Sequence, residues 1–153
     1  LAQHYGVPTQ LLDWTESPYV GAFFAYHDHL LLDRESTDTV AVWTLGVQAP
    51  LWSGKDGVEL VRPPRFTNVR LRNQAGMFTL SRIHFEALEQ YIEAHPWSGT
   101  ALYRFLLPAS DAMSALSDLS AMGITPARVF PDLEGAAATA RQQVILASLA
   151  LRK

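Results

Sequence analysis

The sequence predicts an α+β fold in a single compact domain, with a small mixed sheet flanked by helices. Helical and strand-like segments alternate along its 153 residues, but their spacing is too irregular for a series of βαβ units. Hydrophobic residues make up 48% of the chain and charged residues 18%, which excludes collagen, a coiled coil and general disorder. A chain of this length can bury a core without metal or disulfides, and it contains no cysteine.

The first third of the chain carries clear local signals. Residues 1–6 are typical of the last turn of a helix that ends in glycine, and residues 9–14 predict a short strand. Residues 15–18 place two hydroxyl side chains ahead of a proline, which predicts the start of a helix. The dense apolar content of residues 19–31 predicts that this helix is buried on most sides. Alternating β-branched and aromatic residues predict a strand over residues 39–45.

Glycine and proline interrupt the middle of the chain. Residues 46–57 are expected to form a loop, and the prolines at 63–64 break any regular element. Residues 66–71 are expected to be irregular or a short strand, and residues 77–80 predict another strand. Residues 85–95 combine apolar side chains at helical spacing with three glutamates on the other side, so they predict an amphipathic helix.

The last third predicts one strand followed by helices. Residues 101–107 are apolar enough for a central strand. Ser110 is expected to cap a helix that runs to Met122 and ends at the following glycine. Residues 126–133 predict a turn or the start of a helix, and residues 136–151 predict an alanine-rich helix. This mixed order of elements favours α+β over α/β.

Charge is segregated along the chain, although the net charge is only −3. Acidic residues predominate up to residue 61, whereas the stretch from Leu60 to Phe85 contains no Asp or Glu. Its arginines are Arg62, Arg65, Arg70, Arg72 and Arg82. An exposed, loop-like stretch of this kind can bind phosphate or pyrophosphate through guanidinium groups. A solvated face that pairs with the acidic first third of the same chain explains the pattern equally well.

Several classes of protein are not supported by the sequence. It contains no Walker loop, no Gly-x-Gly-x-x-Gly run and no Gly-x-Ser-x-Gly elbow. His27 and His29 point to different sides of a helix and have no companion ligand motif, so no metal is expected. No apolar run approaches the roughly 20 residues of a membrane span, and no signal peptide opens the chain. We therefore expect a cytoplasmic protein without membrane association.

The densest group of chemically versatile residues lies near the start of the chain. His4, Asp13 and Trp14 supply a donor, an acceptor and a flat stacking surface. A nicotinamide or a nucleic-acid base suits that combination. A buried hydrogen bond between His4 and Asp13 beside a core tryptophan explains the same residues, so both interpretations stay open.

Residues 4–18 read His-Tyr-Gly-x-Pro-Thr-x-Leu-Leu-Asp-Trp-Thr-x-Ser-Pro and are followed by Ala-Phe-Phe-Ala at residues 22–25. This segment resembles the hallmark segment of FRG domains, which are named for an upstream Phe-Arg-Gly element. Two later segments are also similar to FRG motifs: Arg70-x-x-x-Gln74-x-Gly76-x-Phe78-Thr79 and Phe130-Pro131-Asp132-Leu133-x-Gly135.

The sequence departs from the FRG pattern in two places. Gln10 stands where the family usually has arginine, and the Phe-Arg-Gly element is absent. Because the chain starts at Leu1 inside the motif, we expect residues 1–153 to be an FRG-type domain whose N-terminal part is missing or is supplied by a partner chain.

FRG domains occur in bacterial and phage-related proteins, and their order of elements is similar to that of ADP-ribosyltransferases of the Arg-Ser-Glu type. The resemblance implies NAD as substrate, with Thr15 and Ser17 as the hydroxyl strand and Gln74 at the place of the acid. It implies NAD-binding roles for His4, Tyr5, Thr9, Asp13, Trp14, Arg70, Arg72 and Phe78. The implied activity is ADP-ribosyl transfer to a nucleic-acid or protein acceptor, or NAD glycohydrolysis. The alternative is a non-catalytic module that binds nucleic acid or a protein through Arg62 to Arg82.

Overall fold

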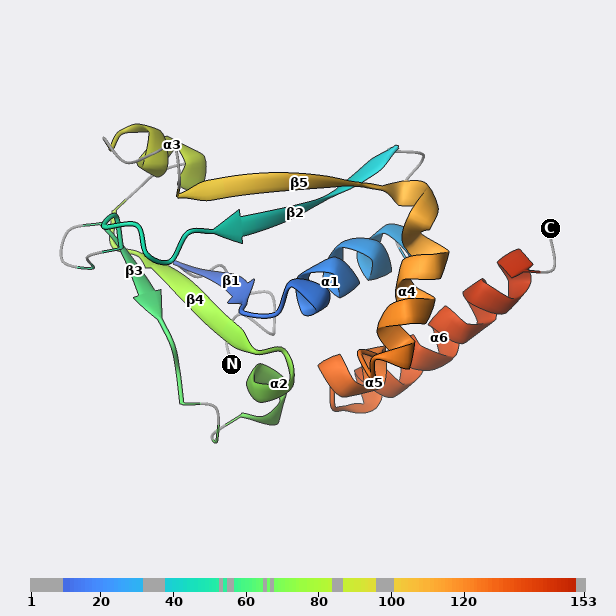
Figure 1. Cartoon of the computed structure of the whole chain (residues 1–153). Coiled ribbons are helices and arrows are strands. Elements are labelled where there is room, and N and C mark those ends of the chain that lie inside the picture. The colour runs from blue at the N-terminus through green and yellow to red at the C-terminus, as the bar shows by residue number, and fades with distance from the viewer. Residues whose placement is uncertain are drawn as a thin grey trace. The chain divides into compact units, whose positions relative to one another are not determined.

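The computed structural model describes residues 10–31, 38–52, 54, 57–64, 66, 68–83, 87–95 and 101–150. Figure 1 shows the elements in chain order: β1 (Leu11–Thr15), α1 (Pro18–Leu31), β2 (Thr39–Leu45), β3 (Val58–Val61), α2 (Val69–Asn73), β4 (Gly76–Ser81), α3 (Leu88–Glu93), β5 (Leu102–Pro108), the 3-10 helix η3 (Ala109–Asp111), α4 (Ala112–Ala121), α5 (Pro126–Val129) and α6 (Leu133–Ala150). The predicted α+β class is confirmed. None of the helices in the described residues is long and apolar enough to cross a membrane.

The strands form two small antiparallel sheets instead of the predicted mixed sheet. One sheet has the order β1-β4-β3, and the other pairs β2 with β5. In the first sheet Val58 lies opposite Ser81, and the Ser81 N–H donates to the Gln10 carbonyl at 3.0 Å. In the second, the Gly46 N–H donates to the Ala101 carbonyl at 2.8 Å.

The chain divides into two compact units. The first unit comprises Leu1–Trp14, Trp43–Pro64 and Gly76–Phe105, and the second comprises Thr15–Val42, Arg65–Ala75 and Leu106–Lys153. The buried core of the first unit consists of Leu51, Val58, Leu88, Tyr91, Ile92 and Ala101. Within it the Tyr91 hydroxyl donates to the Leu51 carbonyl at 2.8 Å, which satisfies a polar group that burial removes from water.

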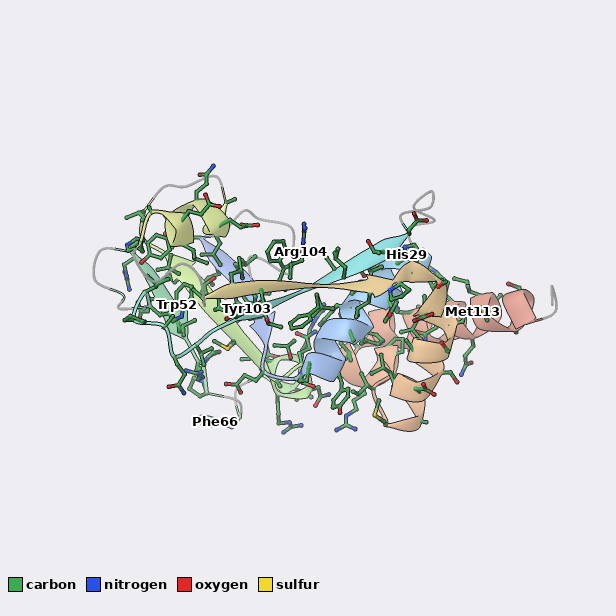
Figure 2. The ribbon with its side chains drawn as sticks, turned by 45° about the horizontal axis from the view of Figure 1, so that its top comes forward. His29, Trp52, Phe66, Tyr103, Arg104 and Met113 are labelled. Carbon is green, nitrogen blue, oxygen red and sulfur yellow. The ribbon has the colours of Figure 1, made fainter. Side chains whose placement is uncertain are left out.

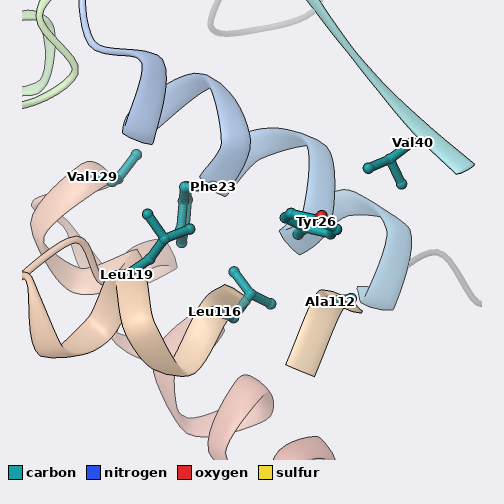
Figure 3. Close-up of a cluster of buried hydrophobic side chains, with 7 residues drawn as sticks. All are labelled: Phe23, Tyr26, Val40, Ala112, Leu116, Leu119 and Val129. Carbon is teal, nitrogen blue, oxygen red and sulfur yellow. The ribbon is translucent and has the colours of Figure 1, made fainter. Parts of the chain in front are cut away.

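The core of the second unit lies mainly between α1 and α4 (Figure 3). Its buried members are Phe23, Tyr26, Val40, Ala112, Leu116, Leu119 and Val129. His27 belongs to this packing, because its buried ring stacks on Phe23 with 4.9 Å between centroids. Burial raises the pKa of the Tyr26 hydroxyl, and the charge of Asp111 raises it further. The prediction that α1 is buried on most sides holds for these side chains, although Tyr19 is exposed.

Two short elements differ from the sequence-based expectation. Residues 69–73 form helix α2, where an irregular segment or a short strand was expected. The Asn68 side chain accepts a hydrogen bond from the Leu71 N–H at 3.2 Å, so a local N-cap starts this helix despite its weak propensity. Residues 58–61 form β3 after the predicted loop, because this short segment pairs with β4.

β5 is wrongly predicted as a central strand. Among the strands of the described residues it pairs only with β2, and its residues 103–106 are exposed. Figure 2 shows Tyr103 and Arg104 projecting from opposite sides of β5. The Arg104 guanidinium lies 5.5 Å from the centroid of the Trp43 ring, so this residue of β5 makes a cation–π contact with a residue of β2.

The predicted cap of the helix after β5 is also wrong. Ser110 lies inside η3, and its hydroxyl donates to the Asp111 carboxylate at 3.3 Å. Helix α4 begins at Ala112, with Asp111 as its N-cap residue. A single turn of 3-10 helix therefore separates β5 from α4.

Candidate functional site

The structure distributes the predicted site residues over both units. The second unit contains Thr15, Ser17, Arg70, Arg72 and Gln74. The first unit contains Asp13, Trp14 and Phe78 among its described residues. His4, Tyr5 and Thr9 lie outside the described residues. The candidate site considered below therefore consists of residues of the second unit.

Thr15 connects the end of β1 to the turn that follows α2. Its hydroxyl donates to the Gln74 carbonyl at 2.7 Å and accepts a hydrogen bond from the Ser17 N–H at 3.1 Å. The Glu16 N–H donates to the carbonyl of Ala75, a residue with a positive φ of 48°. Two hydrogen bonds thus join this junction, although Thr15 and Gln74 are 59 residues apart in the sequence.

Ser17 has a local structural role. Its hydroxyl oxygen lies 3.4 Å from the Val20 N–H, as expected for a residue that caps the start of α1. Helix α1 therefore starts where the hydroxyl and proline pattern predicted it. This contact does not test a catalytic role for Ser17, which stays a prediction.

The amide side chains at the end of α2 hold α5. The Gln74 Nε2 donates to the Val129 carbonyl at 3.3 Å, and the Asn73 Nδ2 donates to the Arg128 carbonyl at 2.7 Å. Carbonyls at a helix end lack partners within the helix, so these amides satisfy groups that would otherwise need water. Gln74 is half-buried, which suits a positioning role between Thr15 and α5.

Arg70 lies one turn before Gln74 on α2 and contacts the segment after α5. Its guanidinium lies 4.7 Å from the centroid of the Phe130 ring, and its Nη1 lies 3.6 Å from the Asp132 Oδ2. The side chain of Arg70 is 26% exposed and that of Asp132 is 46% exposed. Both side chains are therefore partly exposed, so solvent partly screens the attraction between their charges.

Asp132 also begins helix α6. Its Oδ1 accepts a hydrogen bond from the Gly135 N–H at 3.0 Å, so its two carboxylate oxygens face different partners. We call Thr15, Arg70, Gln74, Phe130 and Asp132 the motif cluster. Sequence reasoning did not include Asp132 among the site residues, although the Phe-Pro-Asp-Leu-x-Gly segment that contains it was the available signal.

Trp14 and Phe78 belong to the packing of the first unit. The indole Nε1 donates to the Thr79 Oγ1 at 3.1 Å, and Trp14 is half-buried against the core that contains Leu51 and Val58. Phe78 is half-buried on β4 opposite Val61. These contacts favour the structural interpretation of Trp14, because its polar atom already has an internal partner.

Replacing Thr79 by valine is expected to lower the free energy of unfolding by about 1–3 kcal/mol, because the indole N–H then has no acceptor at a buried position. The tryptophan emission spectrum and chemical denaturation report the change. Thr79→Ser keeps the hydroxyl and is the matched control. Equal stability of Thr79→Val and Thr79→Ser would contradict a structural use of this hydrogen bond.

The arginine stretch does not form the continuous basic loop that was predicted. Arg62 and Arg82 belong to the first unit, whereas Arg70 and Arg72 lie on α2 in the second. The Arg82 Nη2 lies 2.6 Å from the Glu59 Oε2, so this arginine pairs with the acidic first part of the chain. Arg65 lies outside the described residues. Because Arg70 and Arg82 both contact carboxylates, the stretch gives less support to a nucleic-acid interface.

The comparisons with known proteins agree with one part of this description. The model of the FRG domain family matches residues 1–34, so the resemblance to FRG domains is confirmed in this segment. The matched part includes β1 and α1. The similarity of residues 70–79 and 130–135 to later FRG motifs stays a prediction. No curated protein and no solved structure matches the chain.

Proposed function

We propose that this chain binds NAD and cleaves its nicotinamide–ribose bond, and that it passes ADP-ribose to an acceptor or to water. The observation that carries the proposal is the motif cluster. Segments separated by more than 50 residues place a hydroxyl, an amide, a guanidinium and a carboxylate around α2 and the start of α6. The FRG match over residues 1–34 includes Thr15 and gives the proposal its family context.

Arg70 is the proposed pyrophosphate ligand. A guanidinium binds phosphate oxygens through two parallel N–H donors, and its contact with Asp132 at 3.6 Å is longer than the 2.7–2.9 Å typical of a charge-assisted hydrogen bond. A pyrophosphate can therefore compete with Asp132 for Arg70. The Phe130 ring contacts the guanidinium group and limits its movement.

Asp132 is the proposed proton acceptor. Gln74 cannot take a proton, and its Nε2 already donates to the Val129 carbonyl. In the proposed reaction the bond between C1′ and the nicotinamide nitrogen breaks, and the electron pair leaves with neutral nicotinamide. The acceptor oxygen attacks C1′, and its proton passes to the Asp132 carboxylate. Thr15 and Gln74 act as positioning residues that hold α2 in place.

The proposal is tested by measuring NAD binding calorimetrically and nicotinamide release chromatographically. Asp132→Asn keeps an N-cap acceptor for α6 but cannot take the proton, so we expect nicotinamide release to fall by about 10²-fold or more while NAD still binds. Arg70→Gln is expected to weaken NAD binding. Asp118→Asn removes an exposed carboxylate of α4 and is the matched control.

Two results would overturn the proposal. The first is wild-type protein that neither binds nor consumes NAD. The second is an Asp132→Asn variant that releases nicotinamide at the wild-type rate. Far-UV circular dichroism of each variant separates loss of chemistry from loss of the fold.

A further inference from the structure

We propose that the outer side of α2, together with the loop before it, binds single-stranded nucleic acid. The residues that carry the proposal are Phe66, Val69, Arg72 and Arg128, which we call the α2 surface; all four are exposed and belong to the second unit. Phe66 lies on an outer loop (Figure 2) and is 87% exposed, although phenylalanine is among the residue types most often fully buried. The α2 surface therefore combines an accessible aromatic ring with two guanidinium groups.

Arg72 and Arg128 are available to an anionic ligand. Neither arginine forms an ion pair within the part of the chain that the structure describes. The Arg128 Nη1 donates to the Gly123 carbonyl at 3.3 Å, which uses one of the five N–H donors of its guanidinium. Arg70 and Arg82, in contrast, each lie beside a carboxylate and are not part of the α2 surface.

The fold brings the residues of the α2 surface together. The Asn73 Nδ2 donates to the Arg128 carbonyl at 2.7 Å, and Arg72 is the residue before Asn73. Val69 and Arg72 are three residues apart on α2, so they lie on the same side of the helix. The Cα atoms of Phe66 and Arg72 are at most about 15 Å apart, because three residues of loop and three of helix separate them. About five stacked nucleotides, spaced by about 3.4 Å, span this distance.

The local charge favours a polyanion. Residues 60–85 and 119–131 contain no Asp or Glu, although the net charge of the whole chain is −3. The next carboxylate along the chain, that of Asp132, lies beside Arg70. An anion that approaches the α2 surface therefore meets two guanidinium groups whose charges no described carboxylate balances.

The aromatic ring selects nucleic acid over an acidic peptide. An acidic peptide offers carboxylates to the arginines but no flat partner to Phe66. Every nucleic-acid base has a face that stacks on an aromatic ring, and arginines bind the phosphates between the bases. In a duplex the faces of the bases are already stacked on one another, so an unpaired strand is the form that fits. Because stacking does not read the edges of the bases, binding is expected to tolerate any sequence.

Fluorescence anisotropy with a labelled oligothymidine of about 12 nucleotides tests the proposal. The titration contains no NAD, so its outcome is independent of the proposed function. Wild-type protein is expected to bind with a Kd of about 10⁻⁴–10⁻⁶ M. Phe66→Ala is expected to weaken binding about 5–100-fold, because the stacking of one base is lost. Phe66→Trp keeps a stacking ring at the same position and is expected to bind at least as tightly as wild type.

The salt dependence of the same titration tests the arginines. Two phosphate contacts predict a slope of about −1.4 for log K against log salt concentration. Arg72→Gln and Arg128→Gln are each expected to reduce the magnitude of this slope by about 0.7, since each removes one phosphate contact. Arg104→Gln removes an exposed arginine from β5 and is the matched control, with an unchanged slope.

Four results would overturn the proposal. The first is wild-type protein that does not bind the oligothymidine, and the second is a Phe66→Ala variant that binds it as tightly as wild type. The third is a salt slope that stays the same in both glutamine variants of the α2 surface. The fourth is competition by polyglutamate that matches competition by unlabelled oligothymidine at equal charge, because polyglutamate has no bases to stack. Far-UV circular dichroism checks that each variant is folded.

Discussion

Replacing Gly135 by alanine is expected to lower the free energy of unfolding by about 3 kcal/mol, at the upper end of the range for overpacking. A Cβ at this position would lie 1.8 Å from the Phe130 carbonyl oxygen, which is backbone and cannot rotate away. The same glycine donates its N–H to Asp132, so the start of α6 would have to move. Urea denaturation followed by far-UV circular dichroism measures the change.

Gly21→Ala is the matched control for this substitution. A Cβ on Gly21 would lie 3.6 Å from the Val42 Cγ1 and 3.7 Å from the Thr15 Cγ2, which are ordinary contacts. Because Gly21 lies inside α1, alanine is expected to raise the free energy of unfolding by about 0.5–1 kcal/mol. A Gly135→Ala variant that unfolds at the same urea concentration as the wild type would contradict the close approach of the Phe130 carbonyl to Gly135.

Phe23→Ala is expected to lower the free energy of unfolding by about 3–5 kcal/mol. Phe23 is fully buried, and its ring contacts the rings of Phe24, His27 and Phe130. Removing it leaves a cavity between α1 and α4 and also takes one neighbour from Phe130, on which Arg70 stacks. Chemical denaturation measures the loss.

Phe66→Ala is the control with the same chemical change. Phe66 is 87% exposed and lies on an outer loop (Figure 2), so its substitution is expected to change stability by less than about 0.5 kcal/mol. Similar losses for both alanine variants would show that Phe23 is not the centre of the second core. If Phe23→Ala also weakens NAD binding while it stays folded, Phe130 transmits the change to Arg70.

Elements with strong local signals were predicted well. The alternating apolar residues of β2 define its observed bounds, Thr39–Leu45. The hydroxyl and proline signal predicted the start of α1 at Pro18. α2 and β3 were missed because each is only a few residues long. The Asn68 cap stabilises α2, and pairing with β4 stabilises β3. Neither of these contacts produces a periodic pattern of apolar residues in the sequence of the element itself.

The structure brings together only some of the residues predicted for the site, and their functional roles stay predictions. Thr15, Gln74 and Arg70 do lie in one unit, as a shared site requires. Trp14 and Phe78 belong to the other unit, and the indole N–H contacts Thr79. No sequence pattern indicates which side chain 65 residues away accepts a hydrogen bond from an indole, because that depends on the pairing of β1 with β4.

The sequence by itself determined the α+β class, most of the longer elements and the resemblance to FRG domains. These depend on residues close together in the chain, such as caps, prolines and alternating apolar positions. Only the tertiary structure decided that Asp132 lies beside Arg70 and that Glu59 forms an ion pair with Arg82. Such contacts join segments far apart in the chain, and packing rather than local propensity selects them.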